Sequence, residues 1–194
     1  TMGAMAREKP ELLNSASSAA IISCLSTMLQ LMLLLAAIDS ASLQIMLIPL
    51  LAGAGATLIY GAYGLVTWTG GPGVIELGRA FNVKIALAIG ASVGVVQLLS
   101  AALFAWKGND GLLLATTISG FADTHATAAS AANLTHSGKI PVAAIVLPIL
   151  GAISSNTVSK CFMAGIAGGK TFSLRVMPGL LVVLMAVWAG WWLS

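Results

Sequence analysis

The chain has 194 residues, of which 58% are hydrophobic and 8% are charged, and its mean hydropathy is +0.98. Soluble domains carry about 25% charged residues, so this composition excludes an ordinary soluble protein and predicts an integral membrane protein in a lipid bilayer. The net charge of +3 includes no basic run interleaved with aromatic residues, which argues against a nucleic-acid partner. Cys24 and Cys161 lie in apolar segments, and their spacing indicates neither a disulfide framework nor a metal site.

Windows of high hydropathy predict about six transmembrane helices, because each window is close to the ~20 residues that cross ~30 Å of hydrocarbon. Residues that favour turns separate the windows, including Asp39-Ser40 and the segment from Gly165 to Lys170. No alternation of apolar and polar residues recurs over ten positions, which excludes an outer-membrane barrel. We therefore predict an all-α polytopic bundle with spans at 15–38, 43–68, 81–106, 111–133, 140–165 and 173–193.

The chain is expected to form one transmembrane helical domain over residues 1–194. Its first 14 residues are polar and contain no apolar signal core, so the first internal apolar helix is expected to direct insertion. Thr1 opens the chain, and TMGAMAREKP looks like the end of an earlier element. We therefore expect this domain to be the C-terminal part of a longer chain.

Small residues recur on one face of the second span. Gly53, Thr57, Gly61 and Gly64 are separated by four, four and three positions, a spacing that lets helix backbones approach closely in lipid. Two interpretations stay open: tight packing within the chain, or one face of a homodimer.

A polar stripe follows the fourth span. Its members are separated by three, four, four, three and three positions, so they share one face of a helix. Oxygen ligands with one carboxylate are what a cation or proton path requires, although the hydroxyls can instead bond back to helix carbonyls. The stripe consists of Thr116, Ser119, Asp123, Thr127, Ser130 and Asn133.

Gly120 raises a second interpretation, in which this helix is discontinuous near Gly120–Asp123. Asp123 would then cap a half-helix by accepting backbone N–H groups, and transporters build their sites at such breaks. On a continuous helix His125 lies ~200° from Asp123, so only a break lets both line one cavity. His125 would serve as a proton acceptor, or it would bond to a neighbouring helix.

The fifth span carries a second polar segment, SSNTVSK at 154–160. We expect Ser155, Asn156 and Thr157 to face the site across the gap. Residue counting at ~1.5 Å per position places Asp123 ~18 Å from one membrane face and Lys160 close to that face. Lys160 is therefore interpreted as a residue at the mouth whose amine reaches the interface. A pair between Lys160 and Asp123 is the alternative if the helices are broken or shifted.

The sequence resembles the domain of unknown function number 4010 in three places. These are SGFADTHATAASAAN, SSNTVSK and an opening T-x-x-x-x-A-R before Glu-Lys-Pro. That domain follows the MgtC/SapB domain in many bacterial inner-membrane proteins, and the resemblance spans nearly all of the chain. It implies a multi-pass protein of the bacterial inner membrane, sometimes labelled a transporter. His125 stands where the family has a second acidic residue, which argues against a two-carboxylate metal site and favours a proton-linked one. The family pattern falls on Ser119, Gly120, Asp123, Ser130, Ser155, Asn156, Thr157 and Lys160.

The leading hypothesis is a transporter or channel-like protein for a small cation, proton or polar solute. The alternative is a regulatory or assembly protein that docks on another membrane complex without transporting, through a lipid-facing small-residue surface from Gly53 to Gly64. An enzyme is disfavoured, because the sequence contains no Ser-His-Asp constellation, GxSxG elbow or HExxH motif. No cofactor is expected.

Overall fold

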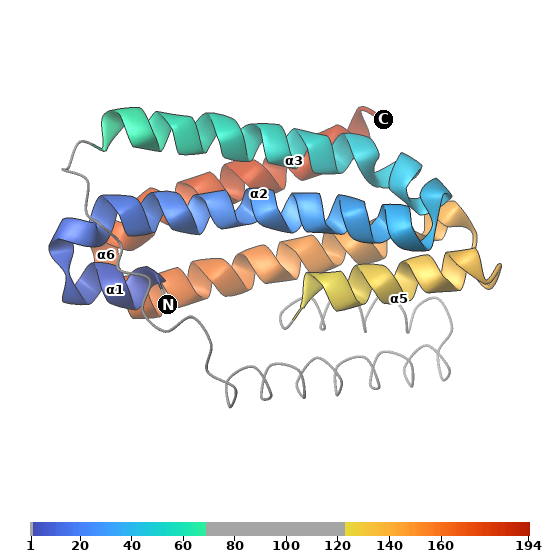
Figure 1. Cartoon of the computed structure of the whole chain (residues 1–194), viewed down its shortest axis with the longest axis horizontal. Helices are drawn as coiled ribbons and strands as arrows, with labels where there is room; N and C mark the ends of the chain where they lie inside the picture. The colour runs from blue at the N-terminus through green and yellow to red at the C-terminus, as the bar shows by residue number, and fades with distance from the viewer. Residues whose placement is uncertain (1, 69–122) are drawn as a thin grey trace. The chain divides into compact units, whose positions relative to one another are not determined.

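The computed structural model of the chain describes residues 2–68 and 123–194 (Figure 1). Within these ranges the chain is helical and contains no strand, which confirms the all-α prediction for this part. The predicted span 81–106 and the first residues of span 111–133 lie outside the described residues. The elements are α1 (Met2–Glu8), η1 (Pro10–Leu12), α2 (Leu13–Ile38), α3 (Ser40–Thr67), α5 (Thr124–His136), η2 (Val142–Ile145) and α6 (Val146–Trp192).

Three helical segments in the described part are long and apolar enough to cross a membrane: Pro10–Ile38, Ser40–Gly64 and Val142–Trp192. Large apolar side chains on these helices are exposed, including Ile59 and Leu174, which are each 75% exposed. Soluble proteins rarely expose extended apolar surfaces of this kind, so a bilayer is the natural surrounding of these helices.

The break between α2 and α3 falls at Asp39, as predicted. The Asp39 carboxylate accepts hydrogen bonds from the Ser42 backbone N–H at 2.9 Å and from the Ser42 hydroxyl at 2.5 Å. The hydrogen bond from the Ser42 hydroxyl holds the pKa of Asp39 below its ordinary value of 3.8, because it stabilises the ionised carboxylate. Asp39 thus satisfies donors at the beginning of α3 that the helix itself leaves unpaired.

The described residues form two compact units. The first contains residues 2–30, 47–68 and 157–194, and the second contains residues 31–46 and 123–156.

In the first unit the small-residue face of α3 is buried against other helices of the same chain. Thr57 is 1% exposed, and a Cβ atom added at Gly53 would lie 2.5 Å from Val187 Cγ2. A Cβ atom added at Gly61 would lie 3.7 Å from Ile22. These contacts confirm the interpretation as packing within the chain. The expected lipid-facing surface from Gly53 to Gly64 was wrong, because the glycines face α2 and the last part of α6.

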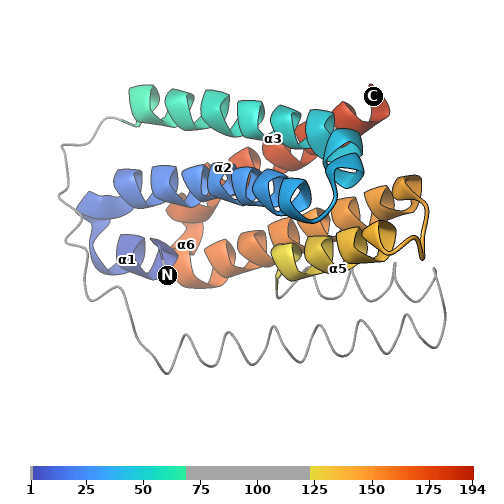
Figure 2. The same cartoon turned by 45° about the vertical axis from the view of Figure 1, so that its right-hand side comes forward.

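The long element α6 is not one straight helix. Gly169 has φ 71° and ψ 179°, and in Figures 1 and 2 the helix reverses its direction there. The Ser173 hydroxyl donates to the Ala164 carbonyl at 2.9 Å, whereas nine residues of straight helix would separate these positions by ~13 Å. Two helical arms, 146–168 and 170–192, therefore meet at a tight turn, and the break predicted between Gly165 and Lys170 is confirmed at Gly169.

Several helices of the first unit are tied together around Arg175, in the second arm of α6. The Arg175 guanidinium donates to Asn14 Oδ1 and lies 5.5 Å from the centre of the Trp68 ring. The Tyr60 hydroxyl donates to the Arg175 carbonyl at 3.1 Å. A cation over an aromatic face is stabilising where water is scarce, so Trp68 anchors this end of α3 through a contact within the protein.

Candidate functional site

The described part of the polar stripe begins where α5 begins. Asp123 has an extended backbone, with φ −158° and ψ 114°, and its carboxylate accepts the His125 backbone N–H at 2.8 Å. Asp is among the best residues at this position because its oxygen satisfies an unpaired helix donor. The positive end of the helix also favours a negative charge. The capping role that we predicted for Asp123 is therefore confirmed, whereas the residues before it lie outside the described ranges.

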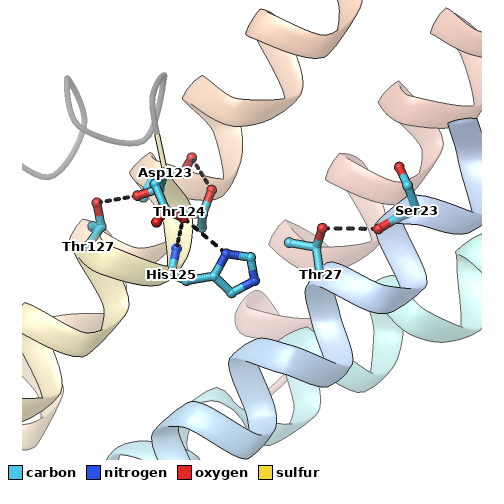
Figure 3. Close-up of polar contacts among 7 residues, drawn as sticks. Ser23, Thr27, Asp123, Thr124, His125 and Thr127 are labelled. Atoms are coloured by element: carbon cyan, nitrogen blue, oxygen red, sulfur yellow. Dashed lines mark hydrogen bonds and ion pairs between the residues drawn. The ribbon is translucent and has the colours of Figure 1, made fainter. Parts of the chain in front are cut away.

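The same carboxylate also contacts the ring of His125. His125 Nδ1 lies 3.0 Å from Asp123 Oδ1, and the two side chains are 33% and 25% exposed (Figure 3). The extended backbone at Asp123 turns the carboxylate back over the first turn of α5, which a continuous helix would not allow. The structure thus brings together two titratable groups that a helical wheel separates.

The other ring nitrogen of His125 has no partner in the part of the chain that the structure describes. Nε2 is buried and forms no hydrogen bond with these residues. In the tautomer that donates from Nδ1 to the carboxylate, Nε2 carries a lone pair, so the imidazole is a base held in place by its carboxylate. A buried polar atom without a hydrogen bond is rare in proteins, and such an atom is often found at a functional site.

Hydroxyl groups on α5 hold this arrangement in place. The Thr127 hydroxyl donates to the Asp123 carbonyl at 3.2 Å, and the Thr124 hydroxyl donates to the Ala152 carbonyl of α6 at 3.5 Å. Thr124 and Thr127 are buried. Thr124 was not among the predicted site residues, because its position beside the stripe carries no signal of a contact with α6.

The polar segment of α6 lies next to this contact. Positions 155 and 156 follow Ala152 by three and four residues, so they share its face of the helix. Ser155 is buried and its hydroxyl donates to the Gly151 carbonyl at 3.0 Å, while Asn156 is half-buried. The hydroxyl hydrogens of Thr127 and Ser155 are therefore used within their own helices, as the alternative reading of the stripe expected, and their oxygens can only accept further bonds.

The remaining predicted site residues are distributed differently. Ser130 is half-buried on α5, and Ser119 lies outside the described residues. Thr157 and Lys160 belong to the first compact unit, whereas Asp123 belongs to the second. Among the described residues, no group of three or more His, Cys, Asp or Glu side chains could hold a metal ion.

Lys160 contacts a residue that lies far away in the sequence. Its Nζ atom lies 3.7 Å from Cys24 Sγ, and Cys24 is buried at the middle of the apolar segment Pro10–Ile38. Helical side chains point toward the N-terminus of their helix, which carries the amine of Lys160 away from the turn at Gly169. No pattern in the sequence indicates this contact, and the position of Lys160 at the mouth stays a prediction.

Taken together, the described residues define an all-helical protein with three segments able to cross a membrane and a carboxylate–imidazole pair at a helix start. The chain belongs to the family described as Domain of unknown function (DUF4010), whose model matches residues 1–168. This match confirms the resemblance to that domain. No curated protein and no solved structure matches the chain.

Proposed function

We propose that this chain is a multi-pass protein of the bacterial inner membrane that transports a small cation, proton or polar solute. In this proposal Asp123 and His125 carry the proton or hold the cation. The observation that carries the proposal is the 3.0 Å contact between the two side chains, with His125 Nε2 buried and without a hydrogen bond.

The depth of the pair supports an intramembrane role. The 13 residues of α5 span ~20 Å, and the polar turn at 137–139 that follows the helix suits a membrane face. Asp123 would then lie ~20 Å from that face, inside a hydrocarbon layer ~30 Å thick. A carboxylate at this depth is costly and is generally kept for function.

In this proposal the pair transfers protons. The lone pair of His125 Nε2 takes up a proton from the transport path, and the Asp123 carboxylate stabilises the imidazolium that forms. Loss of that proton on the other side returns the neutral ring. A cation in place of the proton would bind the carboxylate directly, and the Ser130 hydroxyl oxygen is a further ligand in this proposal.

A polar solute would be bound next to the N-terminal end of α5. Because α5 and the first arm of α6 are joined by a short connection and meet at Thr124 and Ala152, Ser155 and Asn156 lie just beyond the start of α5. The amide of Asn156 can both donate and accept hydrogen bonds. The proposal therefore assigns Asn156 to solute contact and the Asp123–His125 pair to coupling.

Six spans remain part of this proposal. Helices α2 and α3 and the two arms of α6 correspond to the predicted spans 15–38, 43–68, 140–165 and 173–193. The helix α5 is too short to cross a bilayer by itself, which favours a discontinuous fourth span whose second half is α5.

The test uses purified protein in proteoliposomes with a pH gradient and a pH-sensitive dye inside. Asp123→Asn keeps a side-chain oxygen that can cap α5 but removes the charge, so folding is retained and proton flux is lost. Asp123→Ala loses flux and also ~1 kcal/mol of stability with the cap. Asp39→Asn is the matched control. Asp39 is also a carboxylate that caps a helix, α3, and it lies between two apolar helices.

Wild-type proteoliposomes that dissipate the gradient no faster than empty ones, across a panel of small cations and solutes, would refute the proposal. Normal flux from Asp123→Asn would refute the assigned role of the carboxylate. Loss of flux in Asp39→Asn as well as Asp123→Asn would show that any change at a helix cap inactivates the protein.

A further inference from the structure

The first compact unit contains a second polar feature that the proposed function does not use. A cavity of about 200 Å³ lies between the start of α1, α2 and the two arms of α6. Its wall is almost entirely apolar, and Lys160 and Ser23 are its polar side chains. The apolar wall includes Ala19, Ala20, Ala164, Phe172, Val176 and Leu180.

Lys160 brings an ammonium group to this wall, and no anion from the described ranges 2–68 and 123–194 balances it. Its described hydrogen-bond partner is the Cys24 thiol, 3.7 Å from Nζ. Of the described carboxylates, none forms an ion pair with Lys160. The Ser23 hydroxyl donates its hydrogen to the Ala20 carbonyl at 2.6 Å. A cation in an apolar wall at the middle of the segment Pro10–Ile38 is costly unless an anion accompanies it.

The depth and shape of the cavity restrict the anion that fits. A lipid phosphate is held at the membrane surface, whereas the Lys160 amine lies beside the midpoint of a 29-residue apolar segment. A sugar or a dianion would place hydroxyls or a second charge against apolar side chains. A cavity of ~150 Å³ holds benzene, so this one has room for a six-carbon ring with one carboxylate.

We propose that this cavity binds a small hydrophobic monocarboxylate, whose carboxylate pairs with Lys160 and whose apolar body contacts Phe172, Val176 and Leu180. The inference concerns a site in the first unit and does not depend on proton transfer at Asp123. Binding neutralises the ammonium and fills the cavity in one step. The site therefore discriminates against neutral molecules and against more highly charged ones.

The experiment is calorimetric titration of the detergent-purified full chain with benzoate, at a pH well above the pKa of benzoic acid. Benzyl alcohol, which has the same ring without the charge, is the matched ligand. Wild type is expected to bind benzoate saturably and benzyl alcohol at least about 10-fold more weakly, since a charge-assisted hydrogen bond is lost. Equal binding of the two ligands, or no binding of benzoate, would overturn the proposal.

Variants locate the binding. Lys160→Met keeps the length of the side chain and is expected to lose at least about 10-fold in benzoate affinity, whereas Lys160→Arg retains binding. Lys170→Met, at the exposed turn after Gly169, is the control and binds like wild type. Ala164→Leu keeps the charge and fills the cavity, so it is expected to weaken benzoate binding while the Lys160 side chain is unchanged. Unchanged benzoate affinity in folded Lys160→Met or Ala164→Leu would overturn the proposal. If a variant does not fold, the comparison of benzoate with benzyl alcohol on the wild-type protein tests the proposal instead.

Discussion

The turn at Gly169 provides the sharpest test of the described architecture. Its φ of 71° and ψ of 179° lie in a region that only glycine adopts readily. A Cβ atom added there would have nothing within 4 Å, so Gly169→Ala introduces no clash. The expected cost is therefore purely conformational and amounts to about 1–3 kcal/mol.

This cost can be measured by thermal unfolding of the detergent-purified protein, followed by tryptophan fluorescence. For a chain of 150–250 residues, 1 kcal/mol shifts Tm by about 2–4 °C, so Gly169→Ala should lower Tm by about 2–12 °C. Gly165→Ala is the matched control, four residues earlier on the first arm of α6. Its added Cβ would lie 3.6 Å from Met177 Cε, an ordinary contact, and its helical backbone favours Ala by about 0.5–1 kcal/mol.

The prediction fails if Gly169→Ala unfolds at the wild-type temperature, because α6 would then have no backbone conformation at position 169 that requires glycine. It also fails if Gly165→Ala loses as much stability as Gly169→Ala. That result would mean that small size, rather than backbone conformation, is what this turn requires.

Two further predictions concern packing and pH. Gly53→Ala places a Cβ 2.5 Å from Val187 Cγ2 and should cost about 1–3 kcal/mol of stability. In a double-mutant cycle of unfolding, its combination with Val187→Ala should be less than additive by at least about 0.5 kcal/mol, and an additive result would contradict the contact. Gly55→Ala is the control: its Cβ would meet nothing within 4 Å, so it should lose no stability and should gain about 0.5–1 kcal/mol from its helical backbone. At Asp39 the lowered pKa means that the folded state binds a proton less tightly than the unfolded state does. The ionised carboxylate therefore stabilises the fold at pH values above its ordinary pKa of 3.8. This stabilisation is lost as the pH falls through the lowered pKa of the folded state. Asp39→Asn should therefore have a lower Tm than wild type at neutral pH, and the difference should vanish in acid; a difference that does not change with pH would show that the charge is not involved.

The ends of several elements could be predicted from the sequence because local chemistry determines them. The first window, 15–38, nearly coincides with α2 at Leu13–Ile38. The breaks at Asp39 and Gly169 follow from a carboxylate that caps a helix and from a glycine that adopts positive φ. The cap at Asp123 is of the same kind, since it depends on the donors of the next two residues.

What only the tertiary structure decided are the contacts between residues far apart in the chain. Residue counting along straight helices includes neither side-chain direction nor the approach of α2, so it cannot predict which side chains Lys160 contacts. The structure places its amine beside Cys24, 136 positions away, and places Thr124 beside Ala152, 28 positions away. Such contacts arise from how the helices pack, and periodicity within one helix contains no information about the helix that it will meet.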